Sequence, residues 1–342
     1  MTASRSLSVT SVLVSLLVLA ACGSSGARVR GHIITADVYG MRKAPRATIE
    51  ALIGTAMLPE FDEKKVRERL LESSSVANVR FHYEPIGDDE LALFVGIEEP
   101  GREPRPALRA APAGNLALPA RFRANYAALE AARRSALIAG VGDGDFRPGH
   151  ARASDADTRA LEIEMRALAN THAPLVRRVL REASNAGDRA IAALALPYIT
   201  NKRSIIADLV RATSDTDPNV RANAARGLAG LAELSRALGS SDAAIPLQPL
   251  LDLLRSATWT DRTYAVRALL ELTKTRDPVL LATLRSACRA ELLEMANWHS
   301  ERHARPAFLL LARVEGLTDN VALDHWNDDR KEWLTKVAAR SE

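Results

Sequence analysis

The chain of 342 residues is long enough for two or three domains, and its formal charge of +4 is small for that length. Hydrophobic residues make up 47% of the chain, but aromatic residues make up only 4%. Alanine and leucine supply most of the apolar surface, which favours helices with small-residue interfaces over a β-rich core. Lysine and arginine form no basic tail or block, so the charge pattern excludes nucleic acid as an expected partner.

Residues 1–21 have the pattern of a signal peptide. A polar start with one positive charge, Arg5, precedes an apolar run over Leu7–Ala21. This run is shorter and richer in serine than a membrane-spanning helix, which needs about 20 apolar residues. It ends in Leu19-Ala20-Ala21-Cys22, which resembles the lipobox of bacterial lipoproteins.

This resemblance implies cleavage between Ala21 and Cys22 and a diacylglyceryl group on the Cys22 thiol. Several acyl chains together hold a protein firmly at a membrane. In lipoproteins an aspartate after the cysteine favours the inner membrane, but Gly23 stands here, so we expect the periplasmic face of the outer membrane. Residues 22–30 would form a tether of at most ~30 Å. The alternative is an ordinary secretory leader in which Cys22 is incidental.

Residues 31–101 predict a small α/β domain with the element order β-α-α-β-β. Apolar residues alternate in the three predicted strands and recur at three or four residues in the two predicted helices. The predicted strands are 32–39, 79–84 and 91–97, and the predicted helices are 46–56 and 61–73.

This order resembles a POTRA domain. The resemblance is carried by Val38-Tyr39-Gly40, Val79-Arg80-Phe81 and Val95-Gly96-Ile97-Glu98-Glu99, although Met41 stands where the family often has asparagine. It implies a periplasmic docking module whose exposed strand edge pairs with a strand of a protein partner. The residues predicted to bind at this edge are Val79, Arg80, Phe81, His82 and Tyr83. The alternative is that Arg80 and His82 only protect the edge against aggregation.

Residues 102–118 are rich in proline and alanine and predict a semi-extended linker. The rest of the chain predicts helices only. Residues 119–184 are expected to form the helical N-terminal part of a solenoid, residues 185–320 HEAT-like repeats, and residues 321–342 a C-terminal capping helix. The predicted helices are 122–139, 158–169, 174–183, 188–199, 203–213, 217–231, 246–256, 261–272, 278–298, 302–314 and 326–339.

The stretch Asp217–Leu231 resembles the first helix of a HEAT repeat. Asp217 can cap the helix, and Pro218 suits the first helical position. Similar pairs of mostly small residues recur at steps of 32, 41 and 42 residues: Ala192-Ala193, Ala224-Ala225, Ala265-Val266 and Ala307-Phe308. Such helices bury their apolar faces only by stacking, so an all-α solenoid is expected. The Asp-Pro-x-Val-Arg opening is expected in this one unit and degenerate in the others.

The second helices of the predicted repeats would line the concave side of the solenoid. The residues predicted to bind a partner on this face are Arg211, Asp252, Arg255, Arg285 and Arg289. A row of arginines suits an acidic peptide or anionic lipid headgroups. The alternative is a solvated face of mixed charge.

No set of residues predicts a catalytic site, a metal site or a cofactor, and no enzyme activity is expected. His299 and His303 are four residues apart, but Glu301 does not stand where a metalloprotease motif requires its glutamate. Trp326 and Trp333 are expected in the cap of the solenoid. The alternatives are a metal-dependent envelope enzyme that uses residues 299–303, and a cell-wall or glycan-binding surface protein that uses the tryptophans.

The predicted molecule is a lipid-anchored cell-envelope protein with a POTRA-like domain and HEAT-like repeats. Its expected role is a protein–protein interaction scaffold in outer-membrane or envelope assembly. The expected contacts are unidentified protein partners and a membrane reached through the lipid anchor.

Overall fold

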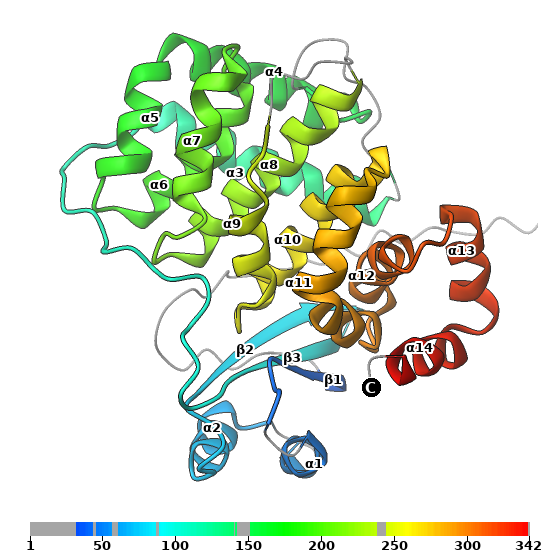
Figure 1. Ribbon diagram of the computed structural model, residues 1–342. Helices are drawn as coiled ribbons and strands as arrows, with labels where there is room; N and C mark the ends of the chain where they lie inside the picture. The colour runs from blue at the N-terminus through cyan, green and yellow to red at the C-terminus, as the bar shows by residue number, and fades with distance from the viewer. Residues whose placement is uncertain are drawn as a thin grey trace, which may run out of the picture.

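The computed structural model describes residues 32–43, 46–56, 61–86, 89–139, 141, 151–237 and 244–340. The predicted signal peptide, the tether and Cys22 therefore lie outside the described residues. The described chain forms a three-stranded sheet with two helices, followed by a largely helical region (Figure 1), so the predicted fold class is confirmed. In these ranges no helix has the length and apolar character needed to cross a membrane.

The central strand of the sheet is β3 (Glu90–Glu98). β1 (His32–Tyr39) runs parallel to β3 and β2 (Asn78–Pro85) runs antiparallel to it, so the strand order is β1-β3-β2. Helices α1 (Arg46–Ala56) and α2 (Glu63–Leu71) cover one face of the sheet. Their buried residues form a small core with alternate residues of the strands, among them Ile49, Ile53, Val66, Leu70, Leu93, Val95 and Ile97.

The other face of the sheet is also buried, because it packs against the helical region. Tyr39, Ala92 and Phe94 belong to the large core of the helices and not to the small core with α1 and α2. Figure 1 shows the sheet between α1 and α2 on one side and the stacked helices on the other. β3 is consequently buried from Leu91 to Ile97 without a break. The expected alternation of buried and exposed residues in this strand is therefore wrong.

The helical region begins with α3 (Ala120–Ile138) and α4 (Ala156–Thr171). The helices of the stack follow in chain order: α5 (Ala173–Glu182), α6 (Ala186–Ala195), the short η1 (Leu196–Tyr198), α7 (Lys202–Ala212), α8 (Pro218–Ala237), α9 (Leu247–Leu254), α10 (Trp259–Leu272), the short η2 (Thr273–Thr275), α11 (Pro278–Ala296) and α12 (Glu301–Val314). Helices α6, α8, α10 and α12 pack side by side in one layer, and α7, α9 and α11 form the second (Figure 1). Ala192, Ala224 and Ala265 are completely buried in the first layer, where small side chains let neighbouring helices approach closely.

The C-terminus differs from the single capping helix that was expected. Two helices, α13 (Asp319–Asp328) and α14 (Arg330–Ala339), meet at Asp329. Trp326 and Trp333 therefore lie on different helices, and both rings contact Phe308 of α12, with centroids 5.3 and 4.9 Å away. Trp333 is buried and Trp326 is half-buried, so both tryptophans pack against the last repeat.

A buried arginine recurs near the start of three successive first-layer helices. Each arginine pairs with a carboxylate: Arg189 with Asp215 at 2.8 Å, Arg221 with Asp261 at 2.9 Å and Arg262 with Glu294 at 2.7 Å. Each also donates to backbone carbonyl groups of the loop that precedes its own helix. The opening as a whole is degenerate in the neighbouring units, as expected, but its arginine is present in all three. The arginine is kept at the 32- and 41-residue steps, whereas the Asp-Pro and Val of the signature are not.

The predicted linker is fastened along one edge of the helical stack. The Arg109 N–H donates to Ser214 O at 2.8 Å, in the loop between α7 and α8. Gly114 exchanges two hydrogen bonds with the loop between α5 and α6, through Glu182 O at 2.8 Å and Ser184 N at 2.7 Å. A Cβ at Gly114 would lie 2.5 Å from Glu182 O, so only glycine fits this approach. We call residues 102–118 the strap, because they tie the sheet to the loops of the stack.

Candidate functional site

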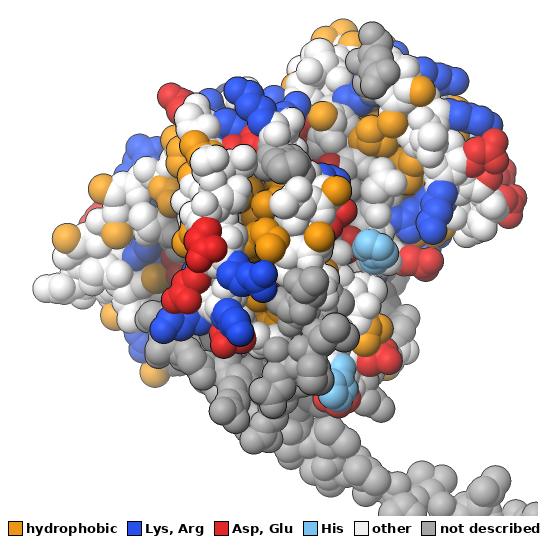
Figure 2. Space-filling model, turned by 90° about the horizontal axis from the view of Figure 1, so that it is seen from below, with side chains coloured by type: hydrophobic (Ala, Val, Ile, Leu, Met, Phe, Trp, Pro, Cys, Tyr) orange, Lys and Arg blue, Asp and Glu red, His pale blue; other side chains and the backbone are white. Residues whose placement is uncertain are grey.

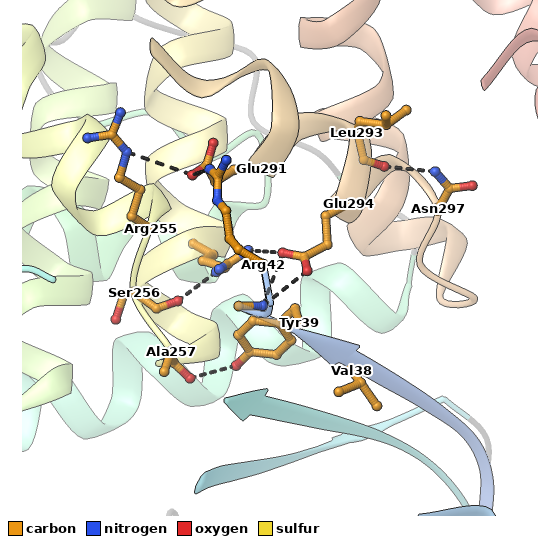
Figure 3. A network of polar contacts seen from close by, with 12 residues as sticks. Val38, Tyr39, Arg42, Arg255, Ser256, Ala257, Glu291, Leu293, Glu294 and Asn297 are labelled. Atoms are coloured by element: carbon orange, nitrogen blue, oxygen red, sulfur yellow. Dashed lines mark hydrogen bonds and ion pairs between the residues drawn. The ribbon is translucent and has the colours of Figure 1, made fainter. Parts of the chain in front are cut away.

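The sheet docks on the loops between second-layer and first-layer helices of consecutive units. The Tyr39 hydroxyl, which is completely buried, donates to Ala257 O at 2.9 Å in the loop before α10 (Figure 3). The Gly40 N–H donates to both carboxylate oxygens of Glu294, at 3.1 and 3.2 Å. Since Gly40 has a φ of +91°, it takes a backbone conformation that favours glycine at the end of β1.

Two carboxylates of α11 gather cations from both parts of the molecule. Glu294 pairs with Arg46 of α1 at 2.9 Å and with Arg262 of α10 at 2.7 Å. Glu291 pairs with Arg42, and Arg255, which directly follows α9, lies 3.8 Å from the same oxygen (Figure 3). These pairs link the sheet domain to two helices of the repeats at once. The contact between the sheet domain and the repeats, which we call the junction, is therefore specified by charge as well as by shape.

Aromatic rings fill the centre of the junction. Phe94 of β3 lies with its ring centroid 5.4 Å from that of Trp259 and 5.1 Å from that of Trp298. His82 of β2 stacks on Trp259 with centroids 3.8 Å apart and planes 11° apart. His303, at the start of α12, meets the same tryptophan edge to face at 4.8 Å.

 The aromatic side chains of this junction are therefore packing partners of one another, and they join the sheet to the repeats.

His299 and His303 do not converge on a common point. The N–H and Nδ1 of His299 both lie within 2.9 Å of the buried Asp37 carboxylate of β1. His303 instead faces β2, with Nε2 3.8 Å from Glu84 Oε1. His299 also precedes α12, so the two residues do not share a helix face. Within the described residues no group of three or more histidine, cysteine or acidic side chains is arranged to hold a metal ion.

Burial lowers the pKa of His303 to about 4, and the charges of Arg267 and Arg302 act in the same direction. Glu84 opposes this effect as a nearby carboxylate. Neither ring nitrogen of His303 has a hydrogen-bond partner among the described residues. The imidazole is therefore neutral at pH 7 and serves as part of the junction.

The predicted binding edge of β2 is open, but most of its side chains contact other parts of the chain. Phe81 and Tyr83 pack on Phe61, with ring centroids 5.9 and 6.1 Å away, and His82 stacks on the repeats. Val79 is buried in the small core, and Arg80 pairs with Glu98 at 3.1 Å.

The backbone of β2 is available over a short length. Ile86 N donates to Glu90 O at 3.0 Å, so Ile86 is a hydrogen-bonded position of the pair that β2 forms with β3. Such positions alternate along antiparallel strands. The N–H and C=O groups of Phe81 and Tyr83 therefore point away from β3. The Val79 carbonyl accepts from Arg67, and Pro85 has no N–H to offer. Pairing of a partner's strand with this edge stays a prediction, and it would use the backbone groups of two residues, Phe81 and Tyr83.

Four of the five residues predicted on the concave face are engaged within the chain. Asp252 lies 3.5 Å from Arg105 of the strap, and Arg255 donates to Ala287 O. Arg285 donates to Val314 O at 3.0 Å, and Arg289 pairs with Glu315 at 2.6 Å. These contacts hold neighbouring helices and the strap together, so the four residues do not form a row of free charges.

The fifth residue, Arg211, lies at a groove that the sequence did not predict. The groove has a volume of about 480 Å³ and is bordered by the strap, α7 and the segment just before α9. Its lining consists of Arg109, Arg203, Ile206, Ala207, Val210, Arg211, Ala244 and Pro246. Arg203 and Arg211 are eight residues apart on α7, but Arg109 comes from the strap. No local sequence pattern could reveal that the strap brings a third arginine to this place.

Figure 2 shows the surface on the underside of the molecule. Acidic and basic side chains are interspersed there, with small apolar patches between them.

Cys288 is buried in α11, and burial raises the pKa of its thiol to about 12. The thiol is therefore protonated at neutral pH.

Comparison with known proteins identifies the repeats. The family described as HEAT repeats matches residues 173–271, which span α5 to α10. No curated protein sequence matches the chain. HEAT repeats commonly mediate protein binding, and their presence here indicates a protein-interaction scaffold.

Proposed function

We propose that the protein is a lipid-anchored scaffold of the bacterial cell envelope. In this proposal Cys22 carries the lipid, and the N-terminal sheet domain is a POTRA-like docking module. The repeats hold a second protein partner at the periplasmic face of the outer membrane. The lipobox-like Leu19–Cys22 supports the anchor, and the match to HEAT repeats supports the scaffold.

The observation that carries the scaffold proposal is the shared core of the sheet and the repeats. Tyr39, Ala92 and Phe94 of the sheet lie in the same buried cluster as the repeat helices. A partner on the sheet and a partner on the repeats would therefore keep a fixed relative position. Such a rigid body suits assembly, where components must be presented in a set geometry.

The test is to express the full chain with its own leader in a bacterium that has two membranes. We expect the wild type to incorporate labelled palmitate and to fractionate with the outer membrane. Cys22→Ser should abolish the label and release the protein from the membrane fraction. Cys288→Ser is the matched control and should leave both properties unchanged. A wild-type chain that takes up no label would contradict the anchor.

The scaffold part is tested separately by cross-linking in the same cells, followed by purification. We expect wild-type protein to yield a defined cross-linked partner that Cys22→Ser loses. Recovery of the lipidated wild type without any cross-linked protein would count against the scaffold.

A further inference from the structure

The groove beside α7 collects arginines that no carboxylate neutralises. Arg109, Arg203 and Arg211 are exposed and form no ion pair among the described residues. Some exposed arginines elsewhere are paired, such as Arg178 with Glu182 at 3.3 Å and Arg285 with Glu315 at 3.6 Å. The groove is therefore a place where positive charge is left without a partner inside the chain.

Helix α7, which borders the groove, and the neighbouring α5 add to this excess of positive charge. Helices α5 and α7 contain five arginines and one lysine but only two carboxylates, Glu182 and Asp208. Asp208 is shared by Arg177 at 2.6 Å and Arg181 at 2.9 Å. A ligand with several negative charges would therefore meet a favourable field before it reaches the groove.

Apolar side chains line the groove between the arginines. Ile206 is buried, Val210 is half-buried, and Ala207 and Pro246 are exposed. A small anion such as phosphate would pair with the arginines but would leave these apolar atoms in contact with water. A ligand that carries both carboxylates and an aliphatic side chain would satisfy both parts of the lining.

We propose that this groove binds an acidic peptide segment with aliphatic residues between its carboxylates, supplied by a protein partner. Charge complementarity and the apolar lining together select this class of ligand. Arginine guanidinium groups would pair with the carboxylates, and the aliphatic side chains would lie on Ile206 and Val210. This inference rests on the proposed scaffold function, and it gives the partner of the repeats a chemical character.

The test uses the purified full chain with Cys22→Ser, so that it does not depend on lipidation or location. The probe is a fluorescent peptide, Glu-Glu-Leu-Glu-Glu-Leu-Glu-Glu, and the readout is fluorescence anisotropy at low and high salt. We expect saturable binding that weakens as salt is added. A peptide with serine in place of leucine should bind at least threefold more weakly, and one with lysine in place of glutamate should not bind.

Substitutions at the groove locate the binding. Arg203→Gln with Arg211→Gln should weaken binding at least tenfold, whereas Arg285→Gln should leave it unchanged. Ala207→Glu and Ala207→Lys are a matched pair, since Ala207 is exposed on α7 and both side chains have similar length. Ala207→Glu should bind at least tenfold more weakly than Ala207→Lys. Circular dichroism verifies that each variant is folded.

Three results would overturn the inference. They are no binding by the wild type, undiminished binding by the protein with both Arg203→Gln and Arg211→Gln, and equal binding by the two Ala207 variants. Vesicles with 30% phosphatidylglycerol give a further comparison by co-sedimentation. If they bind through Arg203 and Arg211 while the peptide does not, the groove recognises a lipid surface instead. Each of these outcomes leaves the membrane-location test of the proposed function unaffected.

Discussion

At the scale of single residues, the arginines that join the repeats show how buried charge can be accommodated. Arg189 and Arg262 are 1–2% exposed, and each satisfies its guanidinium with both a carboxylate and backbone carbonyls. A buried charge that loses its partner costs several kcal/mol, so such pairs specify which helices are neighbours. The repeat steps of 32 and 41 residues place these arginines in register with Arg221. An alignment of the repeats on these steps therefore predicts that the three arginines have equivalent roles.

His303 is a residue whose environment could not be predicted from sequence. Its spacing from His299 suggested a helix face, but the residue packs under the sheet, against groups from three elements. The charged and titratable groups that face it are His82 and Glu84 of β2, Arg267 of α10 and Arg302 of α12. The position of β2 relative to α12 depends on contacts more than 200 residues apart in the chain.

We expect His303 to make the folded state less stable in acid. Burial lowers its folded-state pKa to about 4, while the unfolded value is about 6.5. The unfolded chain therefore binds a proton first, and stability is lost as pH falls from about 6.5 to about 4. The loss should be on the order of 3 kcal/mol. It would be measured as the free energy of unfolding in urea at a series of pH values.

The matched variants for this prediction are His303→Leu and His32→Leu. His303→Leu should flatten the pH dependence between 6.5 and 4, because an aliphatic side chain cannot take up a proton. His32, whose side chain is 77% exposed, should have no such effect when replaced. An unchanged slope in the His303→Leu protein would show that other groups cause the acid sensitivity.

At the scale of elements, β3 is the strand whose two-sided burial organises the molecule. Leu91, Leu93, Val95 and Ile97 alternate along this strand, but the residues between them are also apolar or small. A continuous apolar run is typical of a strand buried on both faces. The sequence thus contained the signal for a second packing layer, but not the identity of the helices that form it.

Gly96 is the position where β3 comes closest to the repeats. A Cβ there would lie 1.9 Å from Ala257 O and 2.9 Å from the Tyr39 hydroxyl oxygen. We expect Gly96→Ala to force the sheet away from the loop before α10 and to cost roughly 1–3 kcal/mol or more. Urea unfolding would measure the loss, and hydrogen exchange would show whether residues 255–259 lose protection.

Gly54 provides the control for this substitution. It lies on the exposed side of α1, and a Cβ there would meet no atom within 4 Å. Gly54→Ala should leave the junction protected and stabilise the protein by about 0.5–1 kcal/mol, since alanine favours a helix. Equal stability of the Gly96→Ala and Gly54→Ala proteins would contradict the close packing of the junction.

At the scale of the whole molecule, the sheet, the strap and the repeats behave as one packing unit. The large buried cluster runs from Tyr39 and Phe94 through the helices to Val337. The strap adds backbone hydrogen bonds at two loops and an ion pair with Asp252. A proline-rich segment that joins two independent domains would not need these contacts.

We therefore expect one cooperative unfolding transition for the full chain with Cys22→Ser. Far-ultraviolet circular dichroism follows the helices, and fluorescence follows the four tryptophans, two of which lie at the junction. The two signals should change at the same urea concentration, because the sheet loses part of its core if the repeats unfold. Two separate transitions in the wild type would show that the sheet and the repeats fold independently.

The local structure of this protein and its repeated helical design follow from patterns within short stretches of the chain. Periodicity predicted the β-α-α-β-β order and nearly every helix, because a helix or strand records its buried face in its own residues. How these parts meet is visible only in the folded molecule. The docking of Phe94 on Trp259, the path of the strap and the meeting of Arg109 with Arg203 and Arg211 join distant segments. Such contacts depend on complementary shape and charge between elements, which no local pattern encodes.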